Sequence, residues 1–451
     1  MIRLREKLAY SAGDIAQNLV QTPLTAFLLF YLTDLVGIGA AIAGTILLFG
    51  QLLNGLTDLV IGYLIDKTET RWGKVRPWVL FTAIPMAVFF VMSFSVPAAL
   101  DETGKIVWIA VSYAAVVAVF FTASNIAYSA LLSVITPDPR ARITLSSFRF
   151  FAALLTILVV SSVTLPVITA LGGDQAAWTT TASIYGAIMV ATMAIVFFGT
   201  KERVVPQGEH SSTAQPARVL FRSIFRNKYF YLVAGLFVCF YIFNGVNQAA
   251  GVYYASDVLG DANTFGLLSI AGLIPVLVGI PFMSAAFRRF GKRRLFLIGS
   301  GVMLAGSLIP LLGPDNLVLV LVGSLIRGFG AVPFAVGLFA IVADVVDYGE
   351  YRFAVRADGL TYSAVTIGLK AGAGVGAGLT GWVLAAGGYT AGAQTQPDTA
   401  ISSIVLLYLV IPAVLVVIIG ILASLFTIEK HGPAIREALA RDAEVESPVA
   451  G

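Results

Sequence analysis

Long apolar segments follow one another along almost the whole chain and are separated by short polar connections. The hydrocarbon core of a bilayer takes about 20 apolar residues as a helix, and twelve segments reach that length. Their ranges are 9–36, 40–66, 76–97, 104–136, 141–170, 176–199, 228–259, 262–287, 293–313, 316–345, 357–388 and 400–427. They lack the alternation of lipid-facing strands, so we predict an all-α membrane protein with twelve transmembrane helices.

The composition agrees with this pattern. The chain is 58% hydrophobic and only 12% charged, whereas soluble domains carry about 25% charged residues. Its mean hydropathy is +0.89. So little charge excludes a soluble enzyme and a disordered protein, and one cysteine, Cys239, excludes a disulfide scaffold. The sequence also shows no nucleophile–base set, so we expect no enzyme activity and no cofactor.

Lys and Arg concentrate in alternate connections. Of 29 basic residues, 25 lie in the N-terminal segment, in every second loop and in the C-terminal tail. Basic loops stay on the cytoplasmic side, so we predict a multi-pass protein of the plasma (inner) membrane with both termini cytoplasmic. The opposite connections carry mainly acids, namely Asp101, Glu102, Asp174, Asp261, Asp315 and Asp398. The net charge of +4 therefore indicates orientation and not nucleic-acid binding.

A polar stretch divides the spans into six and six. The predicted parts are a bundle at 1–199, a flexible cytoplasmic loop at 200–227, a second bundle at 228–427 and a cytoplasmic tail at 428–451. Aromatic-Gly-Lys-x-Arg follows the second span of each half, at 72–76 and 290–294. The alternative is that any short cytoplasmic loop is basic, but the shared glycine favours duplication. Duplicated bundles are typical of secondary transporters that bind their solute between the halves.

Asp58 lies inside the second span, two turns from Asp66 at the cytoplasmic end of that span. An ionisable group at this depth costs at least a few kcal/mol and is a functional hypothesis by default. Asn54 and Thr57 share its helix face, and their neutral oxygens with the carboxylate suit a proton or Na⁺. The alternative is a structural acid paired with a Lys or Arg of another helix.

Polar residues at helical spacing mark four other spans. They are Asp14, Asn18, Gln21 and Thr25; Thr122, Asn125 and Ser129; Tyr241, Asn244 and Gln248; and Ser363, Thr366 and Lys370. One such stripe is readily explained by hydrogen bonds between helices. Four together favour a path for a small polyhydroxylated solute, which needs neutral donors and acceptors. Arg149 and Lys370 are candidate counter-charges for Asp14 and Asp58, while the sequence suggests no partner for Arg327.

Several stretches resemble the glycoside–pentoside–hexuronide:cation symporters of the major facilitator superfamily, which include melibiose permease. The resemblance rests on residues 10–38, 57–80, 148–152, 343–352 and 357–374, and above all on G-x-x-x-D-x-T-x-x-R-W-G-K-x-R-P-W at 62–78. It implies two pseudo-symmetric six-helix bundles, alternating access and symport of a sugar, glycoside or hexuronide with a cation. We also expect a functional monomer surrounded by membrane lipid.

The resemblance also assigns roles to individual residues. Asp58 and Thr122 match cation-site positions, and Arg149 and Lys370 match basic residues near the sugar and cation sites. The positions that bind galactosides in melibiose permease read Asn18, Asn125 and Ser129 here, and the first helix-2 acid reads Asn54, so the galactoside chemistry is absent. The expected substrate set also includes Asp14, Asn244 and Gln248. A conformational motif maps onto Gly62, Asp66, Arg71, Gly73 and Arg76.

These observations predict cation-coupled symport. With one carboxylate left at the cation site, a proton carried by Asp58 is favoured, and Na⁺ would need the neutral oxygens of Asn54, Thr57 and Thr122. One rival is a carrier of amphipathic lipids or other organic solutes, which predicts an apolar cavity. A more remote rival is a membrane receptor that transports nothing.

Overall fold

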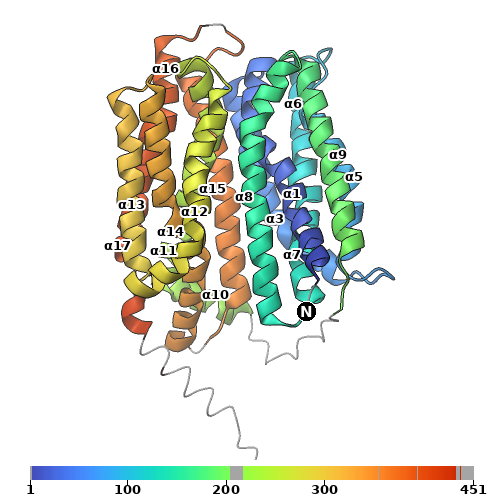
Figure 1. Ribbon diagram of the computed structural model, residues 1–451, viewed down its shortest axis with the longest axis vertical. Coiled ribbons are helices and arrows are strands. Elements are labelled where there is room, and N and C mark those ends of the chain that lie inside the picture. Colours follow the sequence, from blue (N-terminus) through green and yellow to red (C-terminus); the bar gives the residue numbers. More distant parts are fainter. Residues whose placement is uncertain (1–2, 204–216, 354, 394, 433–436, 438–451) are drawn as a thin grey trace, which may run out of the picture.

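The computed structural model describes residues 3–203, 217–353, 355–393, 395–432 and 437. Helices are the only regular elements in these residues (Figure 1). Eleven helical segments are long and apolar enough to cross a membrane. The first span along the chain brings the number to twelve. It is bent by 47° at Phe27, and its two parts are long and apolar enough to cross a membrane only when taken together. Pro23, one turn earlier, removes a backbone donor from this part of the helix and weakens it there.

The twelve predicted spans are confirmed, with boundaries shifted by a few residues. The N-terminal half contains α1 (Leu4–Ala26) with α2 (Leu28–Phe30) and η1 (Tyr31–Leu35); α3 (Ala40–Asp66); α4 (Arg76–Phe81) with α5 (Ala83–Ser93); α6 (Glu102–Ala114), η2 (Ala115–Phe121) and α7 (Thr122–Ile135); α8 (Pro139–Ala170); and α9 (Gln175–Gly199). The C-terminal half contains α11 (Lys228–Tyr253) with η3 (Tyr254–Val258); α12 (Thr264–Phe290); α13 (Lys292–Leu308) with η4 (Ile309–Leu312); α14 (Leu317–Phe353); α15 (Asp358–Ala386); and α16 (Asp398–Val405), η5 (Leu406–Val410) and α17 (Ile411–Leu425), followed by η6 (Ile428–His431).

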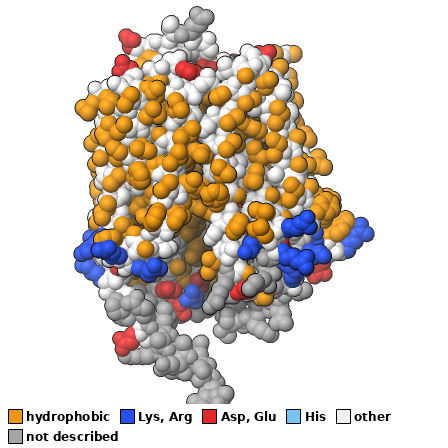
Figure 2. Space-filling model, in the orientation of Figure 1, with side chains coloured by type: hydrophobic (Ala, Val, Ile, Leu, Met, Phe, Trp, Pro, Cys, Tyr) orange, Lys and Arg blue, Asp and Glu red, His pale blue; other side chains and the backbone are white. Residues whose placement is uncertain are grey.

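The two halves stand side by side with their helices roughly parallel to one axis (Figure 1). Lys and Arg side chains gather at the lower end of the view, where the N-terminus also lies, and we call this the basic end (Figure 2). We call the opposite end, which carries the acidic connections, the acidic end. Apolar side chains cover the middle of the visible face, as a lipid-facing surface requires (Figure 2).

The halves touch closely towards the acidic end, where α3 of one half packs on α15 of the other. Glycines allow this approach. A Cβ added to Gly44 would lie 3.0 Å from the Cα of Gly381, and one added to Gly378 would lie 3.2 Å from the Cβ of Leu48. Small residues at such crossings let two membrane helices pack backbone to backbone.

A larger side chain in this crossing is expected to separate the halves. Gly381→Val would drive its branched side chain into the Ala40 carbonyl and Gly44, so we expect the thermal unfolding midpoint to fall and cysteines introduced at the acidic end to gain access to water. The overpacking cost is about 1–3 kcal/mol. Gly301→Ala is the matched control, because a Cβ at that helical position meets nothing within 4 Å. Equal midpoints for the two variants would contradict the role given to this crossing.

The halves diverge towards the basic end, and Figure 2 shows a hollow between them in the lower half of the molecule. Polar residues in the middle of spans are partly or fully exposed, as a water-filled space between the halves requires. Examples are Asn18 on α1, Asn125 and Ser129 on α7 and Ser363 on α15. The structure is therefore closed at the acidic end and open towards the basic end.

The predicted flexible loop at 200–227 contains a helix, α10 (Ala217–Arg226). Ser223 and Ile224 are buried, and Leu220 and Ile224 pack against the core of the C-terminal half. The Ser, Thr, Gln and Pro content suggested a linker, but Leu220 and Ile224 lie one turn apart and form an apolar face that docks. Residues 204–216 of that loop, and most of the predicted tail at 428–451, lie outside the described residues.

Candidate functional site

Asp58 and Lys370 form an ion pair that joins the two halves. Lys370 Nζ, on α15, lies 2.5 Å from Asp58 Oδ1 and 2.7 Å from Asn54 Oδ1, both on α3. Each of the other ion pairs measured lies within one half. The side chains of Lys370 and Asp58 are 17% and 22% exposed, so water reaches the pair. The predicted counter-charge for Asp58 is confirmed, and the pair gives the carboxylate a structural contact as well.

The π-helix η2 brings Thr122 to this pair. The Thr122 hydroxyl lies 2.9 Å from the carbonyl of Val117, five residues earlier, and 2.6 Å from Asn54 Oδ1. π-helical turns inside α-helices occur frequently at functional sites. Asn54 Oδ1 therefore accepts from both Lys370 and Thr122, and it links its own helix, α3, to α15 and to α7.

Two residues that the sequence analysis did not single out extend this network. Gln51 Oε1 accepts from Asn54 Nδ2 at 3.3 Å, and Gln51 Nε2 donates to Tyr113 Oη at 3.2 Å. Gln51 is buried, one turn from Asn54 on the same face of α3, and that spacing was the available signal. Thr57 differs from expectation, because its hydroxyl bonds to the Asn54 carbonyl within its own helix.

A second charged cluster lies within the N-terminal half, where α1, α7 and α8 meet. Arg149 Nε lies 2.6 Å from Asp14 Oδ2, as the sequence analysis predicted. Tyr128 Oη donates to Asp14 Oδ2 at 2.7 Å, and a second guanidinium nitrogen lies 3.3 Å from Ser129 Oγ. The carboxylate is thus held by a cation and a phenol at once.

Aromatic rings enclose this pair. The Arg149 guanidinium lies 4.4 Å from the ring centroid of Tyr128, in cation–π geometry, and donates to Tyr10 Oη at 3.3 Å. Tyr10 precedes Asp14 by one turn and Tyr128 precedes Ser129 by one residue, which is the signal the sequence offered for both. The Arg149 side chain remains 22% exposed, so it can meet a solute in the hollow.

The remaining predicted substrate residues form no hydrogen bond to a side chain of either cluster among the described residues. Asn18 donates to the backbone carbonyl of Asp14, and Asn244 donates to a carbonyl one turn earlier in its own helix. Asn125, Asn244 and Gln248 are partly exposed. Additional candidates are side-chain oxygens that are buried and accept no hydrogen bond within the described residues. They belong to Gln17, Gln21 and Asn247.

Arg327 lies outside both clusters. It is buried in the C-terminal half, with its guanidinium 5.0 Å from the ring centroid of Tyr408 and 3.4 Å from the Tyr408 carbonyl oxygen. Its contacts are those of a packed residue within one half. No group of three or more His, Cys, Asp or Glu side chains that could hold a metal ion occurs in the part of the chain described.

The predicted conformational motif forms a turn at the basic end. Gly73 has φ +110°, a left-handed conformation that favours glycine. Lys74 pairs with Asp66 at 2.8 Å, while Arg71 stacks on Trp72. Arg76 donates to the Phe197 carbonyl of α9. The motif charges are therefore satisfied within the N-terminal half in this conformation.

Glu202, which follows the last helix of the N-terminal half, caps the same turn. Its carboxylate accepts from the backbone N–H groups of Lys74, Val75 and Arg76 at 2.9, 3.0 and 2.9 Å. Glu429 does the same for Lys292 and Arg293 in the C-terminal half. The acid that follows the sixth span of each half thus caps the turn after its second span, which extends the internal repeat beyond the loops compared in the sequence.

Removing this cap is expected to destabilise the basic end. Glu202→Gln keeps the size of the side chain but leaves a carbonyl oxygen where a carboxylate accepted three N–H groups, so we expect a loss of about 1–3 kcal/mol. A lower thermal unfolding midpoint in detergent would report it. Glu69→Gln, an exposed acid of the same loop, controls for the lost charge. A midpoint unchanged from that control would show that the cap is dispensable.

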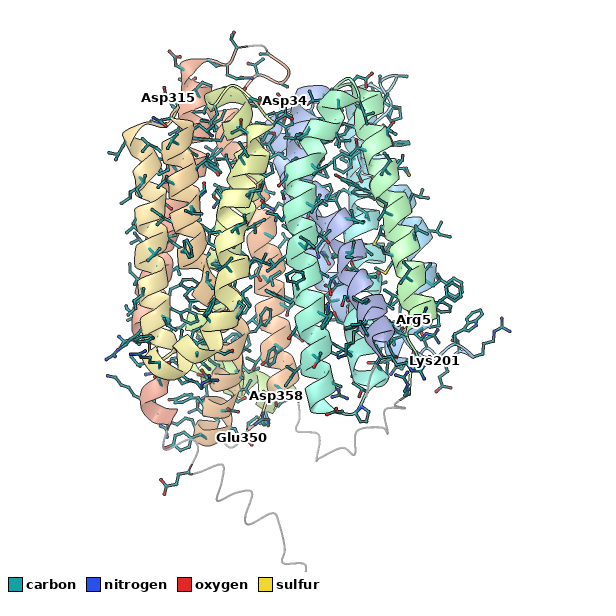
Figure 3. All side chains as sticks on the ribbon, in the orientation of Figure 1. Arg5, Asp34, Lys201, Asp315, Glu350 and Asp358 are labelled. Carbon is teal, nitrogen blue, oxygen red and sulfur yellow. The ribbon has the colours of Figure 1, made fainter. Side chains whose placement is uncertain are left out.

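Two arginines at the basic end, Arg203 and Arg356, form ion pairs that remain partly exposed to water. Hydrogen bonding to Glu6 raises the pKa of Arg203, whose nitrogens lie 2.7 and 3.0 Å from that carboxylate. Hydrogen bonds that Arg356 donates to Glu350 and then to Asp358 raise the pKa of Arg356. Figure 3 shows Glu350 and Asp358 at this end. Both arginines lie in connections between helices and stay charged, and they tie those connections to Glu6 of α1 and Glu350 of α14.

The whole chain is similar to known membrane transporters. The profile of the family described as "MFS/sugar transport protein" matches residues 9–430. An isoprimeverose transporter of Lactiplantibacillus pentosus is 33% identical over 92% of this chain and 86% of its own. A putative glycoside/cation symporter, YagG, of Escherichia coli is 30% identical over 94% and 92%. Among solved structures, a D-xylose-proton symporter aligns with TM-score 0.65 at 13% identity, over 92% of this chain and 96% of that one.

Proposed function

This chain belongs to the MFS/sugar transport protein family, and from that premise we propose which solute class and which ion it moves and how it sits in the membrane. Its relatives are membrane transporters and symporters, so the chain is a secondary active transporter and not an enzyme. We propose symport of a sugar, glycoside or hexuronide with a proton, by alternating access between the two halves.

The observation that carries the proposal is the Asp58–Lys370 pair between the halves. The Lys370 ammonium sits against Asp58 and Asn54, in the position that a mobile cation would take among the same oxygens. A proton that reaches Asp58 neutralises it and releases Lys370. Cation loading therefore breaks a bond between the halves, which is a direct way to couple an ion to their movement.

A proton fits this site better than Na⁺. Asp58 is its one carboxylate, Asn54 Oδ1 already accepts twice, and Thr57 turns back to its own helix. Na⁺ would need several oxygen ligands at once and would compete with the Lys370 ammonium for them. Protonation of Asp58 needs no further ligand.

The cluster of Asp14, Arg149 and Tyr128 supports a polyhydroxylated solute. Its carboxylate and guanidinium and the neighbouring Ser129 hydroxyl offer both acceptors and donors, and a sugar requires both. Tyr10 and Tyr128 are fully buried, so they hold the charged pair in place and do not contact the solute. A carboxylate on the solute would meet Arg149, which accommodates hexuronides within the same class.

We propose that the basic end faces the cytoplasm, because basic connections remain on that side. Both termini would then be cytoplasmic, and the structure would be the inward-open form of a functional monomer surrounded by lipid. The solute would enter from the acidic end after the halves rock about the two clusters.

Uptake into proteoliposomes tests this function. The purified chain is reconstituted and offered radiolabelled pentosides, hexuronides and β-glycosides, with an imposed pH gradient, an imposed Na⁺ gradient or neither. We expect accumulation of at least one of these solutes with the pH gradient alone. Accumulation that requires the Na⁺ gradient would show that the coupling ion is Na⁺ and not H⁺. Absence of both accumulation and exchange for every solute would reject the function.

A further inference from the structure

The two halves end their first spans with similar sequences and the same turn. Residues 30–37 read FYLTDLVG and residues 253–260 read YYASDVLG. Both segments form a π-helix, η1 and η3, and both finish at a left-handed glycine, Gly37 with φ 80° and Gly260 with φ 79°. Asp34 and Asp257 therefore occupy equivalent places in the internal repeat.

These equivalent segments meet where the halves close at the acidic end. Thr33 Oγ1 lies 2.7 Å from Tyr253 Oη, and the ring of Phe30 packs edge-on against Tyr253. Tyr389, in the segment after α15, donates to Asp34 Oδ1 at 2.8 Å. Asp257 follows Tyr253 by one turn, and the ring centroid of Tyr253 lies 5.2 Å from that of Tyr389. Two carboxylates, one from each half, thus lie near the same tyrosine at the closed contact; Figure 3 labels Asp34 at this end.

Asp34 has the donors that an ionised carboxylate needs. It accepts from the Thr33 hydroxyl at 2.6 Å, from the Tyr389 hydroxyl and from the Gly392 N–H. The nearest acceptor of the single Thr33 hydroxyl proton is Asp34 Oδ2, and this leaves Tyr253 as the donor to Thr33. The shortest hydrogen bonds of Thr33 and Tyr389 to a carboxylate thus both go to Asp34.

Asp257 has no such set of donors. Its Oδ2 is buried and without a hydrogen-bond partner in the described residues, and the Tyr389 hydroxyl has given its proton to Asp34. Neither acid forms an ion pair with a described Lys or Arg. Lys105, the cation that reaches this segment, donates to the Val36 carbonyl. Asp257 and Asp34 are both only partly exposed, so an ionised Asp257 would be a second unpaired charge in a partly dehydrated contact, which is costly.

We propose that Asp257 binds a proton in the closed acidic-end contact and donates it to Tyr389 Oη, so that this proton operates a gate between the halves. The resulting chain runs from Asp257 through Tyr389 to Asp34 and gives the unpartnered Asp257 Oδ2 a hydrogen-bond partner. Burial first, then the charge of Asp34, raises the pKa of Tyr389, so this phenol stays a neutral link. The gate is distinct from Asp58 and needs no particular solute.

The direction of the pH effect follows from proton counting. The titratable groups that face Asp257 are Asp34 from η1, Tyr253 from its own helix and Tyr389 from the segment after α15. When the contact opens, water hydrates both carboxylates and Asp257 can release its proton. The closed form thus binds more protons than the open one, so it is favoured as pH falls and is lost as pH rises.

Distance measurements between the halves test the gate without substrate. Spin labels are placed at Leu171→Cys and Leu312→Cys, two exposed positions at the acidic end of either half, in a Cys239→Ala background in nanodiscs. We expect the short-distance population to fall about tenfold between about pH 5 and pH 9. Asp257→Asn, a permanently neutral side chain that keeps a donor for Tyr389, should hold the short distance throughout. Asp261→Asn, an exposed acid of the same end, should respond like the parent.

Asp34→Asn provides a second variant if Asp257→Asn fails to fold. With Asp34 neutral, Tyr389 is free to donate to an ionised Asp257, so the closed contact no longer needs the proton and the pH response should disappear. A parent whose distances ignore pH, or an Asp257→Asn variant with the parent response, would overturn the gate. Because the readout needs no transport, a chain that transports but shows no pH response rejects the gate and leaves the proposed function standing.

Discussion

Asp58→Asn is expected to abolish ion-driven accumulation while leaving solute exchange measurable. The asparagine keeps the shape of the side chain and an acceptor for Lys370, but it cannot take up a proton. A tenfold ion gradient is worth about 1.4 kcal/mol and would hold about tenfold solute accumulation in a one-to-one symporter. In the variant we expect the inside-to-outside ratio to fall to about one.

Counterflow of labelled solute in the same proteoliposomes separates coupling from folding. Exchange needs the loaded carrier to cross but needs no net ion movement, so it should survive. Asp398→Asn, an exposed acid at the acidic end, is the matched control and should accumulate like the parent. A parent-like gradient response in Asp58→Asn would remove Asp58 from the coupling site, whatever its contact with Lys370 contributes to stability.

The second large effect is expected at Arg149. Arg149→Met leaves Asp14 as a buried carboxylate with Tyr128 as its remaining side-chain partner, and breaking a buried ion pair in this way costs about 3–5 kcal/mol. Thermal unfolding in detergent should show a midpoint well below that of the parent. Lys67→Met, which removes an exposed cation from the basic end, controls for the loss of one positive charge.

The double variant Asp14→Asn with Arg149→Met distinguishes stability from solute recognition. Removing both charges eliminates the unpaired carboxylate, so we expect most of the lost stability to return. Transport should not return, because the cluster has lost the guanidinium and the carboxylate that would meet a sugar. A double variant that transports at the parental rate would place the solute elsewhere in the hollow.

The internal repeat shows how far patterns along the chain reach. The Gly-Lys pairs at Gly73 and Gly291 were visible in the sequence, and the structure gives both glycines a positive φ. The caps that Glu202 and Glu429 place on these turns were not predicted, since each acid lies more than a hundred residues from the groups that it holds. The segments that contain Asp34 and Asp257 are also similar in sequence. That these two acids lie near each other follows only from the closed arrangement of the two halves.

Hydropathy and charge along the chain were sufficient for the twelve spans, the division into halves and the identity of the few ionisable groups in the membrane. These features follow from local physics, because a bilayer imposes length and apolarity on each helix separately. The sequence analysis predicted that Arg149 neutralises Asp14 and that Lys370 neutralises Asp58. It did not predict the other residues of the two clusters, which include Tyr10, Tyr128 and Gln51. Which side chains share a cluster depends on how far each helix is rotated and shifted against its neighbours, and that is set by packing between segments distant in the chain.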